Sequence, residues 1–178
     1  MYRPFPIRKS ALLNIGSYGA GQFKYYGMAQ EKHCWLIRTN KLIRQVFENA
    51  VYDGDDCCVS LDGCAALFGP TKSALKLHVD LVPGIPGYDF GSVQGAYNLY
   101  GVGVDAETGK AGAGFMCVPG SHKTYMDRWA EVSSKIKFAI PKKHWLVLDE
   151  DSPLQGSEVL VLSPPNSLII WKSELLHK

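Results

Sequence analysis

The pattern of hydrophobic and polar positions changes once along the chain, near residue 57. Before that point the clearest periodic stretch is 41–51, which follows Thr39 and Asn40, two residues that can cap a helix. Apolar residues recur there at helical spacing: Leu42, Ile43, Val46, Phe47 and Ala50. We expect an amphipathic helix that packs on a sheet. Residues 1–30 are interrupted by glycines and predict mostly irregular structure, with a short helix near 22–28.

After residue 57, short apolar or alternating runs are separated by Gly and Pro. The expected strands are 57–68 (as one strand, or two broken at Gly63), 73–82, 92–102, 114–118, 145–148, 159–162 and 167–171, with one helix over 124–136. Many short strands with turn signals predict a sandwich or closed roll. We therefore expect one mainly β domain over 1–178, with flanking helices: a helical or irregular region at 1–56 and a β core at 57–178.

Composition narrows the class of protein. The chain has 178 residues, 46% of them hydrophobic and 20% charged, which is an ordinary globular mixture. A net charge of +2 gives no reason to expect nucleic acid or an anionic membrane as a partner, and no apolar run approaches the length of a membrane span. The apolar run at 11–13 is too short for a secretory signal. We expect a cytoplasmic protein, with no protein partner indicated.

The cysteines and most histidines carry no recognisable pattern. Five cysteines (Cys34, Cys57, Cys58, Cys64 and Cys117) form an odd set without metal-finger spacing. They are interpreted as buried thiols in a reducing compartment. His33 and His144 lie beside Cys34 and Trp145, and are interpreted as surface or core residues.

The run at 75–80 brings together side chains that can bind a metal. In a strand alternate side chains share a face, so His78 and Asp80 point the same way. A distant imidazole would complete a set of two histidines and one carboxylate, which suits non-haem Fe(II). His177 is the candidate, 177 − 78 = 99 residues downstream. Alone, a His-x-Asp pair is a weak signal, because His78 can equally be a core histidine and Asp80 a turn residue.

Several motifs strengthen that signal through their order and spacing. They are found at 35–40, 59–63, 77–80, 93–99, 118–123 (Val-Pro-Gly-Ser-His-Lys) and 167–171, the last leading to His177. On these motifs the chain resembles the phytanoyl-CoA dioxygenase-like family of Fe(II)/2-oxoglutarate-dependent oxygenases, and the resemblance covers most of the chain.

The resemblance implies a fold, a cofactor and a reaction. The fold would be a double-stranded β-helix, the cupin-like jelly roll, with Fe(II) held by His78, Asp80 and His177. The enzyme would use O₂ and the co-substrate 2-oxoglutarate, with ascorbate as a further candidate cofactor. It would hydroxylate a small organic metabolite while 2-oxoglutarate is oxidatively decarboxylated to succinate. Asp80 favours hydroxylation, because related halogenases have a small residue in its place.

Three residues are candidates for binding the co-substrate. Gln94 and Asn98 lie four positions apart on the expected strand 92–102 and share a face, so either can reach 2-oxoglutarate or pair with nearby backbone. Arg38 can face the pocket or form a salt bridge with Asp62. His122 is expected to hydrogen-bond within its loop or shape the pocket rim, not to bind the metal.

One family feature has no counterpart in the sequence. The family anchors 2-oxoglutarate with an arginine about ten residues beyond the distal histidine, whereas this sequence ends at Lys178. The expectation is a fragment whose roll lacks its final strand. The alternatives are a shortened, inactive relative, or replacement of that arginine by Arg38 or Arg128. The competing functions are a non-catalytic or degenerate cupin-like binding domain that retains the metal motif, and a metal-binding cupin that works without 2-oxoglutarate.

Overall fold

The computed structural model describes residues 22–23, 27–51, 53–54, 58–59, 63–65, 75–80, 92–123, 146–148, 150 and 152–178. The chain forms two compact units, 1–74 and 75–178. The expected helix over 124–136 lies outside the described residues. The last described residues before it, 121–123, form a helical turn.

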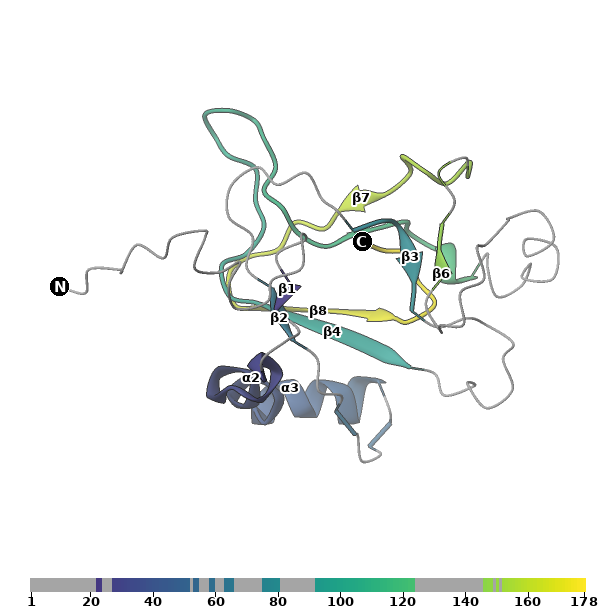
Figure 1. Cartoon of the computed structure of the whole chain (residues 1–178). Helices are drawn as coiled ribbons and strands as arrows, with labels where there is room; N and C mark the ends of the chain where they lie inside the picture. The colour runs from purple at the N-terminus through teal and green to yellow at the C-terminus, as the bar shows by residue number, and fades with distance from the viewer. Residues whose placement is uncertain are drawn as a thin grey trace. The chain divides into compact units, whose positions relative to one another are not determined.

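The N-terminal unit contains the helices and one small strand pair (Figure 1). A 3₁₀ turn η1 (Met28–Gln30) precedes α2 (Lys32–Arg38), and α3 (Lys41–Gln45) continues into a π-helical turn η2 (Val46–Val51). The Asn40 side chain accepts hydrogen bonds from the backbone N–H groups of Leu42 and Ile43 at 2.9 and 3.3 Å. The expected helix over 41–51 and its cap are therefore confirmed.

Two details of this unit differ from expectation. The short helix near 22–28 is wrong, because β1 (Gln22–Phe23) is a strand that pairs antiparallel with β2 (Cys64–Ala65). The pairing partner of β1 lies about forty residues away, so the local pattern of hydrophobic residues does not reveal it. The apolar face of the helix over 41–51 is also less buried than expected, since Leu42 is 72% exposed and Val46 36%. Periodicity identifies the apolar face of a helix, but it does not say what covers that face.

The longest strands of the C-terminal unit are β4 (Val93–Asn98) and β8 (Ser167–Lys172), which run side by side in Figure 1. They pair antiparallel over six positions, from Val93 opposite Lys172 to Asn98 opposite Ser167. β4 is shorter than the expected 92–102 strand because the chain turns at Gly101, whose φ is +76°. A Cβ there would lie 2.7 Å from backbone atoms of Ser163 and Pro165, so the turn requires glycine.

A second group of strands surrounds the C-terminal segment, which we define as residues 176–178. β3 (His78–Val79) pairs with β6 (Leu146–Val147), and β5 (Met116–Cys117) pairs with β7 (Val159–Leu160). The C-terminal segment lies between β3 and β5, and it is bridged antiparallel to both through His177. The order across this sheet is thus β6, β3, C-terminal segment, β5, β7.

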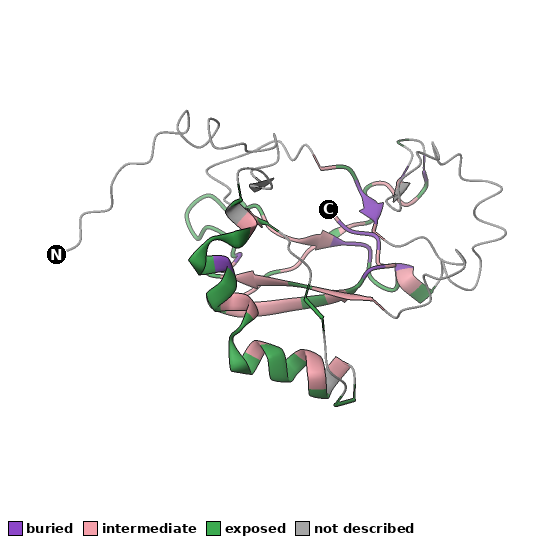
Figure 2. Cartoon of the chain, turned by 60° about the horizontal axis from the view of Figure 1, so that its bottom comes forward, coloured by how far each residue is buried: buried purple, intermediate pink, exposed green. Residues whose placement is uncertain are grey.

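The core of this unit lies around β3 and the C-terminal segment, where Figure 2 shows buried residues. Its apolar members include Leu77, Val79, Val118, Leu148 and Leu176. Leu77, His78 and Val79 are consecutive and all buried, so both faces of β3 are covered. The described residues form a sheet-rich structure of small antiparallel strand pairs with few helices, which confirms the mainly β expectation at that level. None of the helices described is both long and apolar enough to span a membrane.

Candidate metal centre

The two histidines expected to bind a metal face each other across the sheet. The backbone N–H of His78 donates to the carbonyl of His177, and the N–H of His177 donates to the carbonyl of His78, both at 2.9 Å. Residues paired in this way project their side chains from the same face of the sheet. The two imidazole rings accordingly lie 4.4 Å apart, centroid to centroid. Both residues are 5% exposed, so the pair is shielded from water.

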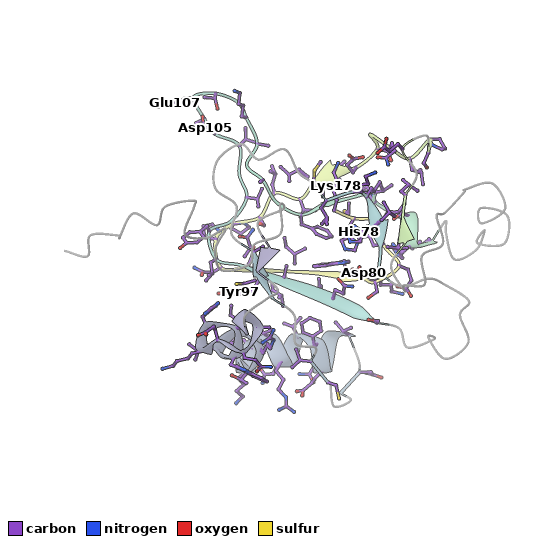
Figure 3. All side chains as sticks on the ribbon, viewed as in Figure 1. His78, Asp80, Tyr97, Asp105, Glu107 and Lys178 are labelled. Atoms are coloured by element: carbon purple, nitrogen blue, oxygen red, sulfur yellow. The ribbon has the colours of Figure 1, made fainter. Side chains whose placement is uncertain are left out.

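Asp80, the residue that directly follows β3, completes the cluster (Figure 3). Its Oδ1 lies 3.6 Å from Nε2 of His78, and its Oδ2 lies 3.3 Å from Nε2 of His177. One ligand atom from each of the three residues lies within 4.8 Å of the others. Adjacent ligands of an octahedral ion with bonds of about 2.1 Å are roughly 3 Å apart, so small side-chain shifts bring these atoms to metal-binding distance.

Both imidazoles have their second nitrogen fixed by the backbone. Nδ1 of His78 lies 2.7 Å from the carbonyl oxygen of Lys76, and Nδ1 of His177 lies 2.8 Å from that of Leu175. A carbonyl oxygen only accepts, so each Nδ1 carries the hydrogen and each neutral ring presents the lone pair of Nε2. Metal-binding histidines are commonly oriented by such a bond. The Nε2 lone pairs of the two neutral rings and the carboxylate of Asp80 therefore face one another, and a cation can bind to all three.

The Asp80 carboxylate is held in its ionised form. Burial raises its pKa, but the hydrogen bond from Gln94, together with the hydrogen bond from His177 and the charges of His78 and His177 when these rings are protonated, outweighs burial, so that its pKa is lowered overall. The Gln94 amide donates from Nε2 to Oδ2 of Asp80 at 2.7 Å. Gln94 therefore lies beside the cluster, and its observed contact is with the candidate ligand Asp80.

Aromatic rings line one side of the cluster. The Trp171 ring lies 5.4 Å from the His177 ring, and Phe115 lies 4.4 Å from Trp171 and 5.6 Å from His177. Trp171 pairs directly with Gln94 across β4 and β8, so the two side chains share a face. Nε1 of Trp171 is buried and has no hydrogen-bond partner among the described residues. Sequence reasoning did not identify either aromatic residue as part of a site.

The Val-Pro-Gly-Ser-His-Lys run fixes the segment that carries His177. The carbonyl of Leu176 accepts from the N–H of Val118 at 2.9 Å, and the N–H of Leu176 donates to Oγ of Ser121 at 2.9 Å. Lys178 exchanges two backbone hydrogen bonds with Met116 at 2.9 and 3.0 Å, and its ammonium group pairs with Glu158. His177 is therefore held by bonds on both sides. The sequence analysis placed Ser121 in a family motif, but it did not predict the hydrogen bond between Ser121 and Leu176.

Three other residues singled out in the sequence, Asn98, His122 and Arg38, are not members of the three-residue cluster. Asn98 donates to Oγ of Ser163 at 3.0 Å and accepts from the N–H of Gly101 at 3.1 Å, which stabilises the turn after β4. His122 is half-buried, and its Nδ1 has no hydrogen-bond partner among the described residues.

Arg38 belongs to the N-terminal unit. Its guanidinium donates to the carbonyl of Ala29 and lies 5.5 Å from the Trp35 ring centroid. Asp62, the partner considered for it, lies outside the described residues, as does Arg128. These two contacts of Arg38, with Ala29 and Trp35, are local ones.

No protein-family model, curated protein or solved structure matches this chain. Its class is accordingly defined by its own fold and site. It is a sheet-rich protein in which His78, Asp80 and His177 form a group that can hold a metal ion.

Proposed function

We propose that this protein is an Fe(II)/2-oxoglutarate-dependent dioxygenase that hydroxylates a small organic metabolite. The observation that carries the proposal is the convergence of Nε2 of His78, Nε2 of His177 and the Asp80 carboxylate, with both Nδ1 atoms tied to backbone carbonyls. Two imidazoles and a carboxylate on one side of an ion are typical of non-haem Fe(II) oxygenases, because the opposite side stays open. The choice of 2-oxoglutarate rests on the family resemblance of the sequence.

The order of strand pairing supports a double-stranded β-helix as the fold. The chain leaves the sheet that contains β3 to form β4, and returns in β5 and β7. It leaves again in β8, which pairs with β4, and returns in the C-terminal segment beside β3. Two sheets that exchange the chain in this way enclose a space between their inner faces, and His78 and Asp80 are expected to point into that space.

The residues of the chain have separable roles in this proposal. His78, Asp80 and His177 would hold Fe(II), which supplies O₂ activation coupled to decarboxylation of 2-oxoglutarate. Gln94 fixes the orientation of the Asp80 carboxylate through a 2.7 Å hydrogen bond. The rings of Trp171 and Phe115 keep water from one side of His177. The unpartnered Nε1 of Trp171 is a donor available to an oxygen of the anionic co-substrate. A reducing, cytoplasmic location would keep the iron in the ferrous state.

The experiment is an anaerobic titration of the protein with Fe(II) and then 2-oxoglutarate. We expect a weak visible charge-transfer band, and succinate on admission of O₂. His78→Ala should abolish both signals, whereas the control His122→Ala should keep them, because His122 is not a member of the cluster. A protein that binds no Fe(II) would rule the proposal out. Iron binding without the 2-oxoglutarate band would instead favour the non-catalytic binding domain.

A further inference from the structure

A second group of metal-binding side chains lies in the N-terminal unit. His33 and Cys34 lie in the first turn of α2, and Cys64 is the first residue of β2. One ligand atom from each lies within 4.8 Å of the others. Within the described part of the chain this is the only such group besides His78, Asp80 and His177. It is built from different elements and from softer ligands.

We propose that His33, Cys34 and Cys64 bind one Zn²⁺ ion. Two thiolates and an imidazole match the borderline-soft preference of Zn²⁺, whereas Fe(II) in the proposed dioxygenase centre is held by imidazole and carboxylate. Tetrahedral Zn²⁺, with bonds of about 2.3 Å to sulfur and 2.0–2.1 Å to nitrogen, places its ligand atoms roughly 3.5–3.8 Å apart. The cluster reaches that spacing if its atoms move inward by about 1 Å at most.

The burial of the three residues suits an open zinc site. Cys34 is buried at 6% exposure, Cys64 is half-buried and His33 is exposed. The two sulfur atoms thus form the inner side of the site, while the imidazole lies at the entry path from solvent. Three protein ligands leave the fourth tetrahedral position to water, as in zinc sites that are not fully closed.

A zinc ion at this site would also stabilise the fold of the N-terminal unit. β1 and β2 pair over only two residues each, which is too short a ladder to be stable alone. Zn²⁺ held by Cys34 and Cys64 would tie α2 to β2 and close a loop of 64 − 34 = 30 residues. The site cannot be recognised in the sequence, because two adjacent ligands in a helix and a third one 30 residues later do not match the spacing of a zinc-finger motif.

The oxidation state of the cysteines is compatible with metal binding. Cys34 and Cys64 are both in the thiol form. The competing interpretation is a redox pair that forms a disulfide without any metal.

The test uses Co²⁺ as the probe on the full chain, reduced and stripped of metal. Thiolate ligands give Co²⁺ an intense near-ultraviolet charge-transfer band that imidazole and carboxylate ligands cannot give. We expect this band to saturate at one equivalent, to be displaced by Zn²⁺, and to be lost in Cys64→Ser. It should persist in Asp80→Ala and in the matched control Cys58→Ser, since Cys58 is exposed and outside the cluster. These variants also separate this proposal from that of the dioxygenase centre.

His33→Ala gives a second readout on an exposed residue, whose substitution should not disturb folding. We expect Co²⁺ to bind at least about tenfold more weakly, because one of three protein ligands is lost. The proposal is overturned if the wild-type protein shows no thiolate band, if the band survives both Cys34→Ser and Cys64→Ser, or if Cys34 and Cys64 form a disulfide in the presence of equimolar Zn²⁺.

Discussion

His78 and His177, 177 − 78 = 99 residues apart, are joined by a reciprocal pair of 2.9 Å backbone hydrogen bonds, and their rings lie 4.4 Å apart. The backbone pairing alone therefore brings two imidazoles to one point. The register of the strands determines the geometry, because a slip of one residue would turn one ring to the opposite face. Such a site is organised before a metal binds, which lowers the cost of binding.

The first prediction concerns Gln94, whose amide donates to Asp80 at 2.7 Å. Gln94→Leu removes this donor, so the carboxylate loses its fixed orientation beside the two imidazoles. We expect metal affinity to fall about 10–100-fold, as is usual when a partner of a metal ligand is lost. Titration with Fe(II) under anaerobic conditions measures the change.

Asn98→Ala is the control on the same strand and face as Gln94. Asn98 lies four residues along β4, about 13 Å away, and its amide is hydrogen-bonded to Ser163 and to the N–H of Gly101, neither of which belongs to the cluster. This variant should lose roughly 1 kcal/mol of stability and leave metal affinity unchanged. Equal losses of metal affinity in the two variants would contradict a positioning role for Gln94.

How far the site could be predicted differs between its residues. His78 and Asp80 were predictable, because the two-residue period of a strand is a local rule. His177 could be proposed as a ligand from its position in the sequence. The hydrogen bonds that hold its segment could not be predicted, because they come from Met116, Val118 and Ser121 on another part of the chain. Hydrogen bonds between residues so far apart depend on strand register, and sequence periodicity does not contain the register of distant strands.

The N-terminal half illustrates the same limit. The Asn40 cap and the helix after it were predictable, because both depend on residues within three positions of each other. The β1–β2 pair was not, and its absence from the prediction produced the wrong helix near 22–28. The cluster of His33, Cys34 and Cys64 was missed for the same reason. Only the pairing of distant segments brings those ligands together.

The second prediction concerns Ser121, which is 4% exposed and accepts a hydrogen bond from the N–H of Leu176 at 2.9 Å. Ser121→Ala leaves that buried N–H without its partner, which should cost about 1–3 kcal/mol of unfolding free energy. Metal affinity should fall as well, because Leu176 precedes His177. Urea denaturation and Fe(II) titration measure the two effects.

Ser157→Ala is the matched control. Ser157 is exposed, and its Oγ donates to the Leu154 carbonyl within a surface turn. We expect a stability change within about 0.5 kcal/mol and no change in metal affinity. If Ser121→Ala behaves in the same way as this control, Ser121 does not hold the C-terminal segment.

The third prediction concerns Trp171 and rests on the proposed dioxygenase function. Trp171→Phe removes the buried, unpartnered Nε1–H but keeps an aromatic ring beside Phe115 and His177. We expect 2-oxoglutarate to bind about tenfold more weakly or worse, because a hydrogen bond to a charged group contributes roughly 1.5–3 kcal/mol. Fe(II) affinity should be unchanged, and the midpoint of the charge-transfer band in a 2-oxoglutarate titration gives the result. An unchanged midpoint would mean that this donor does not face the co-substrate.

The fourth prediction is a pH dependence at Glu158, which pairs with the ammonium group of Lys178 beside His177. The hydrogen bond from Lys178 is the main reason that the pKa of Glu158 is lowered, with its own backbone adding to the effect. A carboxyl whose folded-state pKa lies below its unfolded value of about 4.3 stabilises the fold above that value. The stabilisation is lost as the pH falls through the lower, folded-state pKa.

Glu158→Gln should therefore destabilise the protein by about 1 kcal/mol at pH 7, and the difference from wild type should shrink below about pH 4. Glu150→Gln is the control, because its pair with Lys76 is 2.7 Å long but the two side chains are 76% and 58% exposed. Solvent screens that pair, so its loss should leave stability nearly unchanged at pH 7. Urea denaturation of the three proteins between pH 3 and 7 measures both effects. A Glu158→Gln deficit that stays constant down to pH 3 would show that the lost stability comes from packing and not from the ionised pair.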